Sequence, residues 1–325
     1  MSQLISRRVM IFVENLYQEL ELWYPLLRLK EEGIETKLVG SGSSEMYTGK
    51  NGFPVRPEVT ASSVGARDFD GVIIPGGFAP DYLRRYPAVI HLIKETYQQG
   101  KLIGALCRAP SVLISGDIIR GKRVTGNHSI RDDITNAGAE FVDLPVVVDG
   151  NILTAQGPND LPLFMKEVLS FFWQMKPRLK EYFPDGWVID AHYDSILLSD
   201  LIAGRPVVLF FFDSVFSPTA AQFLPAYHDM KERMTGVGGL FLGISSDSFF
   251  SQKDAINHYQ LSYPLLSDVS GNLIKAFGVL GKKWLAEWSV FLIDKNGILR
   301  YGENCPQGDF GSLPGFKRQL ENIIQ

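Results

Sequence analysis

The chain has 325 residues, a formal net charge of −4, 45% hydrophobic residues and 21% charged residues. This length exceeds one ordinary core and predicts two domains, and the composition excludes a disordered chain. The slightly acidic charge gives no reason to expect nucleic acid as a partner. Cys107 and Cys305 are the only cysteines, so neither a disulfide framework nor a CxxC metal motif is present.

The first half alternates apolar runs with helical patterns, which is the rhythm of a parallel sheet covered on both faces. Strands are expected at 7–13, 35–40, 68–77 and 101–107, and helices at 20–33, 87–100, 109–116, 129–139 and 160–175. A two-stranded hairpin over 141–156 should turn at Asp149-Gly150.

Residues 177–190, PRLKEYFPDGWVID, contain two prolines and a glycine and are predicted to be a linker between domains 1–176 and 191–325. A second βα series then follows, with strands expected at 206–213 and 239–247, helices at 218–234, 251–261 and 315–325, and a hairpin over 288–303 that turns at Asn296-Gly297.

The apolar run near the N-terminus stops at Glu14, which is too short for the apolar region of a signal peptide. No stretch approaches the ~20 apolar residues of a membrane span. With only two cysteines, the chain is expected in a reducing, cytoplasmic compartment, without a membrane as partner.

Cys107 stands in GALCRAP, at the end of an apolar strand and directly before a helix. One interpretation is packing, since free cysteine is often buried. The other is a nucleophile elbow, where the helix N-terminus lowers the pKa of the thiol. Gly76 and Gly77 end another strand and would let backbone N–H groups approach a carbonyl as an oxyanion hole. Together these features favour the nucleophile.

Residues 7–175 resemble the ThiJ/PfpI superfamily, closest to the PfpI group of intracellular proteases and glyoxalase-like or deglycase enzymes. Its fold is the flavodoxin-like, class I glutamine amidotransferase-like three-layer sheet. The stretches that carry the resemblance are ELELWYPLLRLKEEG, IIPGGFAPDYLR, GALCRAPSVLISG, IRDDITNAGAEFVD, VVVDGN and GPNDLPLF.

The resemblance implies roles for further residues. Glu21 stands four residues before Pro25 and would hydrogen-bond the nucleophile as a buried, protonated carboxyl. Arg108 occupies the position where hydrolytic members carry His, and it cannot act as a base at neutral pH. Asp81 matches an acidic residue that reaches a neighbouring subunit's site, and it could pair with Arg108 instead. His128 is a possible substitute base in the substrate pocket.

Residues 191–325 resemble a thioredoxin-like peroxiredoxin domain of the alkyl hydroperoxide reductase type, through the stretches GRPVVLFFFDSVFSPTAAQF and SVFLIDKNGIL. Aligning VFSPTA to the family motif puts Ser217 at its Thr and Ala220 at its peroxidatic Cys, and Trp288 stands where an Arg is expected. No peroxide reduction is therefore expected. Cys305 lies in a loop position where a free Cys is more often incidental, and a disulfide with Cys107 is not indicated.

Three functions follow from these residues. The first is a cysteine-dependent hydrolase-like enzyme, in which Cys107 attacks reactive carbonyls, glycated adducts, peptides or amides in protection against stress. The second is a redox-sensing or chaperone-like protein whose Cys107 oxidises without turnover. The third is a binding scaffold of two degenerate domains. No cofactor and no metal are indicated, and a homo-oligomer is implied by the resemblance.

Overall fold

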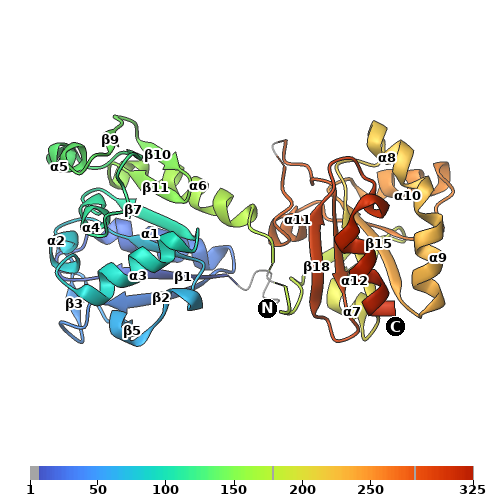
Figure 1. The fold of residues 1–325 in the computed structure, drawn as a ribbon, viewed down its shortest axis with the longest axis horizontal. Coiled ribbons are helices and arrows are strands. Elements are labelled where there is room, and N and C mark those ends of the chain that lie inside the picture. The colour runs from blue at the N-terminus through green and yellow to red at the C-terminus, as the bar shows by residue number, and fades with distance from the viewer. Residues whose placement is uncertain (1–6, 178, 282, 325) are drawn as a thin grey trace. The chain divides into compact units, whose positions relative to one another are not determined.

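The computed structural model describes residues 7–177, 179–281 and 283–324. The chain divides into two compact units, one that ends at Phe171 and one that begins at Phe172. Figure 1 shows that each unit is built on a sheet with helices around it. Each unit also has its own buried core, as expected for a chain too long for a single core.

The first unit contains a seven-stranded sheet in the order β10-β11-β7-β6-β1-β2-β5. All neighbouring strands are parallel except β10 and β11. The central strands are buried from end to end because helices cover both faces, which is why continuous apolar runs form them. The bounds are β1 (Arg8–Val13), β2 (Glu35–Gly40), β5 (Val59–Thr60), β6 (Gly71–Ile74), β7 (Leu102–Leu106), β10 (Val146–Asp149) and β11 (Ile152–Ala155).

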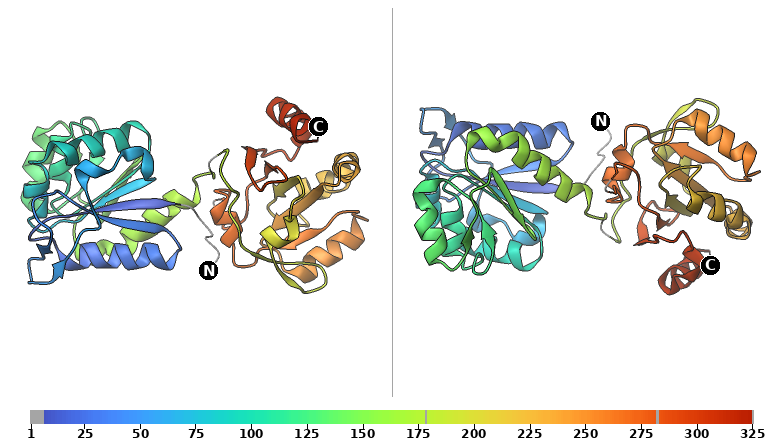
Figure 2. Two further views of the ribbon diagram at one scale, coloured as in Figure 1. Left: turned by 90° about the horizontal axis from the view of Figure 1, so that it is seen from below. Right: turned by 90° about the horizontal axis from the view of Figure 1, so that it is seen from above.

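Helices lie on both faces of this sheet, as Figure 2 shows. The helices are α1 (Glu19–Glu31), α2 (Ala79–Leu83), α3 (Pro87–Gln98), α4 (Pro110–Ser115), α5 (Arg131–Asn136) and α6 (Leu161–Trp173). On the face of α1 and α6, Phe164 lies against Gly104 of β7. On the opposite face, α3 and α4 pack with Met10 and Phe12 of β1. This arrangement confirms the flavodoxin-like three-layer fold that the sequence predicts.

The strand order defines where a site can form. Strand β1 lies between β2 and β6, so the sheet grows in opposite directions on its two sides. In open parallel sheets, ligands bind beyond the carboxyl ends of the strands at such a point. Tyr17, after β1, forms a β-bridge with Gly77, after β6. Cys107 follows β7 directly, so three strand ends meet at this edge of the sheet.

Smaller elements connect the larger ones. A hairpin of β3 (Tyr47–Thr48) and β4 (Pro54–Val55) follows β2, in a region where the sequence predicts no regular element. Strands β8 (Arg123–Val124) and β9 (Glu140–Phe141) pair in parallel. The hairpin β10–β11 turns at Gly150-Asn151, one residue later than predicted, because Asp149 still pairs with Ile152; Gly150 has a positive φ of 62°.

The second unit contains a mixed seven-stranded sheet in the order β13-β12-β16-β15-β14-β17-β18. Strands β14, β15 and β16 are parallel, and the other pairs are antiparallel. The strands are β12 (Trp187–Ile189), β13 (Ser195–Leu197), β14 (Val207–Phe211), β15 (Leu240–Ser245), β16 (Leu265–Ser267), β17 (Ser289–Ile293) and β18 (Leu299–Asn304). The helices are α7 (Leu198–Ile202), α8 (Pro218–Phe223), α9 (His228–Gly236), α10 (Phe249–His258), α11 (Asn272–Ala276) and α12 (Pro314–Ile324). The predicted turn at Asn296-Gly297 joins β17 and β18.

The segment 177–190 contains more structure than a linker. Strand β12 lies inside it and pairs with β13 and β16. Tyr182 forms a β-bridge with Ile298, and the N–H of Phe183 donates to the carbonyl of Gly297 at 3.0 Å. Pro177, Pro184 and Gly186 all precede β12, which lies between β13 and β16, so this segment leads directly into the second sheet.

Candidate active site

Cys107 occupies the sharp turn between β7 and α4. Its φ is 57°, in the left-handed region that side chains with a Cβ rarely adopt. The backbone is held on both sides: the Cys107 N–H donates to the Ala155 carbonyl at 2.9 Å, and its carbonyl accepts from Asn127 N–H at 2.8 Å. Such strained residues persist where the surroundings over-determine them, and they cluster at active sites.

The sulfur of Cys107 receives opposing electrostatic influences. Burial raises the pKa of this thiol to about 11, and the charge of Glu21 adds to the increase. The backbone N–H groups of Gly77 and Arg108 hydrogen-bond the sulfur and act in the other direction. The lowered pKa that the sequence predicts is therefore wrong, because burial outweighs the amides.

Glu21 lies in the first turn of α1 and is completely buried. Its Oε2 accepts the Gly76 N–H at 2.7 Å, whereas its Oε1 is buried without a hydrogen-bond partner. Burial raises the pKa of this carboxyl to about 7. The sequence predicts a protonated carboxyl that hydrogen-bonds the nucleophile. The direction of the pKa shift agrees with the first part, but neither carboxyl oxygen is hydrogen-bonded to Cys107, so the second part is wrong.

Gly76 lies between the carboxyl and the thiol. A Cβ placed on Gly76 would lie 2.5 Å from the Cβ of Cys107 and 2.7 Å from Oε2 of Glu21. Gly77 has a φ of 75°, and a Cβ there would lie 2.3 Å from the Leu16 carbonyl oxygen. The glycine pair therefore allows the close backbone approach that the sequence predicts.

Arg108 is the residue in the position of the missing histidine. Its Nη2 lies 3.1 Å from Oδ2 of Asp81, which confirms the pairing that the sequence suggested. The guanidinium carbon also lies 4.9 Å from the centre of the Phe78 ring. The cation is thus neutralised and stacked beside the nucleophile, so its side chain is already engaged on two sides.

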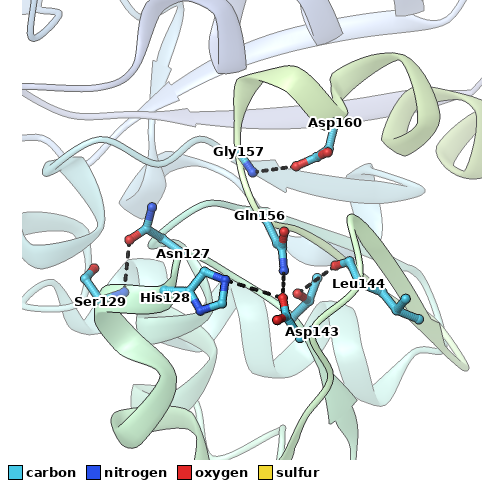
Figure 3. A network of polar contacts seen from close by, with 9 residues as sticks. Asn127, His128, Ser129, Asp143, Leu144, Gln156, Gly157 and Asp160 are labelled. Carbon is cyan, nitrogen blue, oxygen red and sulfur yellow. Dashed lines mark hydrogen bonds and ion pairs between the residues drawn. The ribbon is translucent and has the colours of Figure 1, made fainter.

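His128 does not act as the substitute base in this arrangement. Figure 3 shows its ring turned toward Asp143, and its Nε2 lies 3.3 Å from Oδ1 of that carboxylate. Gln156 donates to the same oxygen at 2.7 Å, and the His128 side chain is 62% exposed. Among the described residues, no hydrogen bond joins His128 to Cys107, although Asn127 is bonded to the Cys107 backbone.

Lys50 is a residue near this site that the sequence analysis missed. Its charge lowers the pKa of both Glu21 and Cys107. It lies in the turn between β3 and β4, for which the sequence carries no recognisable motif. Only the folding of this turn onto the segment after β1 brings its cation to the site.

In the second unit, the three residues of the degenerate peroxiredoxin site do lie together, around Asp213. Ser217 Oγ donates to Asp213 Oδ1 at 2.7 Å, and the indole N–H of Trp288 donates to the same oxygen at 2.9 Å. Ser217 Oγ also accepts the N–H of Ala220 at 3.1 Å and so caps α8. The sequence analysis did not identify Asp213. Its carboxylate accepts a hydrogen bond from Trp288, the residue that stands in the position of the family's arginine.

We predict that Ala220→Cys does not create a peroxidase. Ala220 is fully buried, and the carboxylate of Asp213 is held nearby by Ser217 and Trp288. A thiolate there would meet negative charge and would lack the arginine that stabilises it. The variant should consume hydrogen peroxide no faster than wild type in a thiol-coupled assay. Peroxide-dependent turnover in this variant, absent from an Ala220→Ser control, would contradict the prediction.

Cys305 follows β18 and lies outside the regular elements, as the sequence predicts. It is buried, and its N–H donates to the Trp288 carbonyl at 2.7 Å. Burial raises the pKa of its thiol, and N–H groups of Gly308 and Gln307 oppose that increase. Both cysteines of the chain are free thiols.

Two general features complete the description. Within residues 7–177, 179–281 and 283–324, no group of three or more His, Cys, Asp or Glu side chains is placed to hold a metal ion. Over the same ranges, none of the helices has the length and apolarity needed to cross a bilayer.

A mainly parallel sheet with a strained cysteine in the turn from β7 to α4, faced by two backbone amides and a buried glutamate, is typical of α/β proteins with a strand-to-helix elbow. The chain belongs to the DJ-1/PfpI family, which matches residues 7–171. Residues 179–302 match the AhpC/TSA family, in agreement with the mixed, thioredoxin-like sheet of the second unit.

Relatives of the first domain span about half of this chain. An uncharacterized protein of Archaeoglobus fulgidus is 44% identical over 162 residues, which cover 50% of this chain and 96% of the relative. A deglycase of Thermococcus kodakarensis is 38% identical and the deglycase PfpI of Pyrococcus furiosus is 36% identical, each over 49% of this chain and 96% of the relative.

A solved structure shows the same first domain joined to a different second one. The two-domain protein of Anabaena variabilis with DJ-1/ThiJ/PfpI-like and ferritin-like domains is 41% identical, with a TM-score of 0.50. The similarity covers 51% of this chain and 48% of that protein. It therefore concerns about half of each chain, and the domains that accompany the shared half differ.

Proposed function

We propose that this protein is a cysteine-dependent, hydrolase-like enzyme in which Cys107 attacks reactive carbonyl groups, including those of glycated adducts. The observation that carries the proposal is the sulfur of a strained cysteine, hydrogen-bonded by the N–H groups of Gly77 and Arg108 beside a buried Glu21. Two relatives are named as deglycases, which agrees with this class of substrate. We place the activity in the cytoplasm, where free thiols stay reduced.

The proposed first step uses one shared proton. The Cys107 thiol first passes its proton to the Glu21 carboxylate; the resulting sulfur anion then forms a bond to the carbonyl carbon, and the π electrons of the C=O bond move to oxygen. That oxygen takes the proton of the neutral Glu21 carboxyl, so the products are a hemithioacetal and a Glu21 carboxylate. The raised pKa of Glu21, about 7, allows this carboxyl to hold a proton near neutral pH and then release it.

For a 2-oxo aldehyde, no outside oxidant is needed. The Glu21 carboxylate removes the proton of the hemithioacetal carbon, and the hydroxyl proton on that carbon passes to the neighbouring ketone oxygen. Glu21 then returns its proton to the former ketone carbon, which gives a thioester. Water then cleaves the thioester, releasing a 2-hydroxy acid and restoring the Cys107 thiol. The aldehyde carbon is oxidised as the ketone carbon is reduced, so electrons balance within the substrate. Arg108, held by Asp81, has no part in these proton transfers.

Methylglyoxal turnover tests the proposal. Wild type should convert methylglyoxal to lactate, and Cys107→Ser should lose more than about a hundredfold of this rate, because the nucleophile is absent. Cys305→Ser serves as the matched control and should keep the rate, since Cys305 is buried in the other unit. Equal rates in Cys107→Ser and wild type would overturn the proposal.

A further inference from the structure

Lys50, like Arg108, is a cation of the site to which the proposed reaction assigns no step. Its turn is fastened to the segment after β1 by several hydrogen bonds. The Lys50 N–H donates to the Tyr17 carbonyl at 2.9 Å, and the Gly49 N–H donates to the Phe53 carbonyl at 2.8 Å. Asn51 donates to both carboxylate oxygens of Glu19 at 2.6 and 2.7 Å. The turn is therefore held in one place relative to the site.

The same layer of backbone continues to the nucleophile. Tyr17, which accepts from Lys50, forms a β-bridge with Gly77. The N–H of Gly77 in turn hydrogen-bonds the sulfur of Cys107. Tyr17 and Gly77 thus link the backbone of the Lys50 turn to the thiol. The charge of Lys50 acts on both Cys107 and Glu21.

Lys50 also differs from the neighbouring cation in having no partner. Its residue is exposed, and among the described residues no ion pair or hydrogen bond engages its ammonium group. Arg108 is already paired with Asp81 at 3.1 Å. The carboxylate of Glu19, which lies near the turn, accepts two hydrogen bonds from Asn51. The ammonium group of Lys50 is therefore an exposed cation at this site that is available to a bound molecule.

We propose that Lys50 makes the Cys107 site selective for carbonyl compounds that carry an anionic group, a carboxylate or a phosphate. The inference rests on the proposed function and names its substrate class. An ammonium group at the rim of a nucleophilic site attracts anions and holds them by ion pairing. The anionic group would pair with Lys50 while the carbonyl carbon lies at the sulfur of Cys107, and a neutral carbonyl compound would lack this attachment.

Two alkylating agents that react with thiolates in the same way, one charged and one neutral, test the anion selectivity of the site without any turnover. Iodoacetate is an anion and iodoacetamide is neutral, and in both reactions the sulfur bonds to the CH2 carbon as iodide leaves. Labelling of Cys107 should be followed by mass spectrometry of its peptide, which separates it from Cys305. The ratio of the iodoacetate rate to the iodoacetamide rate does not depend on the thiol pKa, because both agents consume the same thiolate.

We expect the ratio to fall about fivefold in Lys50→Met, from the loss of one unit of positive charge near the sulfur. Lys50→Arg should keep the wild-type ratio. Lys94→Met, on α3, changes the net charge equally and should also keep it, because Lys94 does not act on the Cys107 thiol. Likewise, glyoxylate should protect Cys107 from iodoacetamide less well in Lys50→Met, and protection by methylglyoxal should not change.

The inference and the proposed function can fail separately. An unchanged ratio in Lys50→Met, with iodoacetamide still labelling Cys107, would overturn the role of Lys50 and leave the nucleophile intact. A ratio that falls in Lys50→Met as expected supports the anion site, whether or not the protein turns over a carbonyl compound. An absence of carbonyl turnover would instead count against the proposed enzyme.

Discussion

Replacing Gly77 by Ala is expected to destabilise the first unit by about 3 kcal/mol or more. The added Cβ would lie 2.3 Å from the Leu16 carbonyl oxygen and 2.7 Å from the Gln18 nitrogen, both of them backbone atoms that no side-chain rotation can move away. The φ of 75° adds backbone strain. The measurement is the free energy of unfolding in urea, followed by circular dichroism of the full chain.

Gly33→Ala separates the two contributions. Gly33 has nearly the same φ, 73°, but an added Cβ would have no atom within 4 Å. This control should cost about 1 kcal/mol, which is the strain alone. The Gly77 variant should also lose iodoacetamide labelling of Cys107 at neutral pH, because its N–H no longer points at the sulfur. Equal losses of stability in Gly77→Ala and Gly33→Ala would contradict the close approach of Gly77 to the backbone of Leu16.

Glu21→Gln is expected to raise the free energy of unfolding by about 3 kcal/mol at pH 8 and by little at pH 4. Burial raises the pKa of Glu21 from 4.5 to about 7, so the native state binds this proton more tightly than the unfolded state. The stability from the proton is complete below pH 4.5 and is lost as the pH rises through 7. Each unit of pKa difference corresponds to about 1.4 kcal/mol. Gln has the same shape and no charge, so it avoids this loss.

The measurement is urea unfolding of wild type and variant at several pH values from 4 to 8. Glu31→Gln is a matched control on the same helix, since Glu31 is exposed and paired with Arg28, and its effect should be small and should not follow the same curve. A difference between wild type and Glu21→Gln that stays constant from pH 4 to pH 8 would contradict the raised pKa of Glu21.

The residues of the site that sequence reasoning found are those placed by local rules. Cys107 follows directly from an apolar strand that opens into a helix, and the glycine pair ends a neighbouring strand. Parallel strands bring their carboxyl ends to one edge, so these segments had to meet. Glu21 was recognised only from its spacing to Pro25 in a family pattern, and the structure then placed it against Gly76.

The residues that sequence reasoning missed or misplaced depend on contacts between distant segments. Lys50 reaches the site because its turn binds Tyr17, and Asp213 joins Ser217 to Trp288 across the second core. The sequence offers His128 as a possible base, but its ring pairs with Asp143, which Gln156 also contacts. Apart from Asp213 and Ser217, which are four residues apart, these partners are distant in sequence, so no local pattern could reveal them.

The sequence by itself determined the two α/β units, their hairpin turns and the position of the nucleophile, because strand burial, turn chemistry and the strand-to-helix junction are encoded in short stretches of residues. Only the tertiary structure decided the charge state and surroundings of that nucleophile. The pKa of Cys107 depends on burial, on Glu21, on Lys50 and on two amides from different loops. Electrostatic interactions of this kind are set by distances and burial in three dimensions, which composition and spacing do not contain.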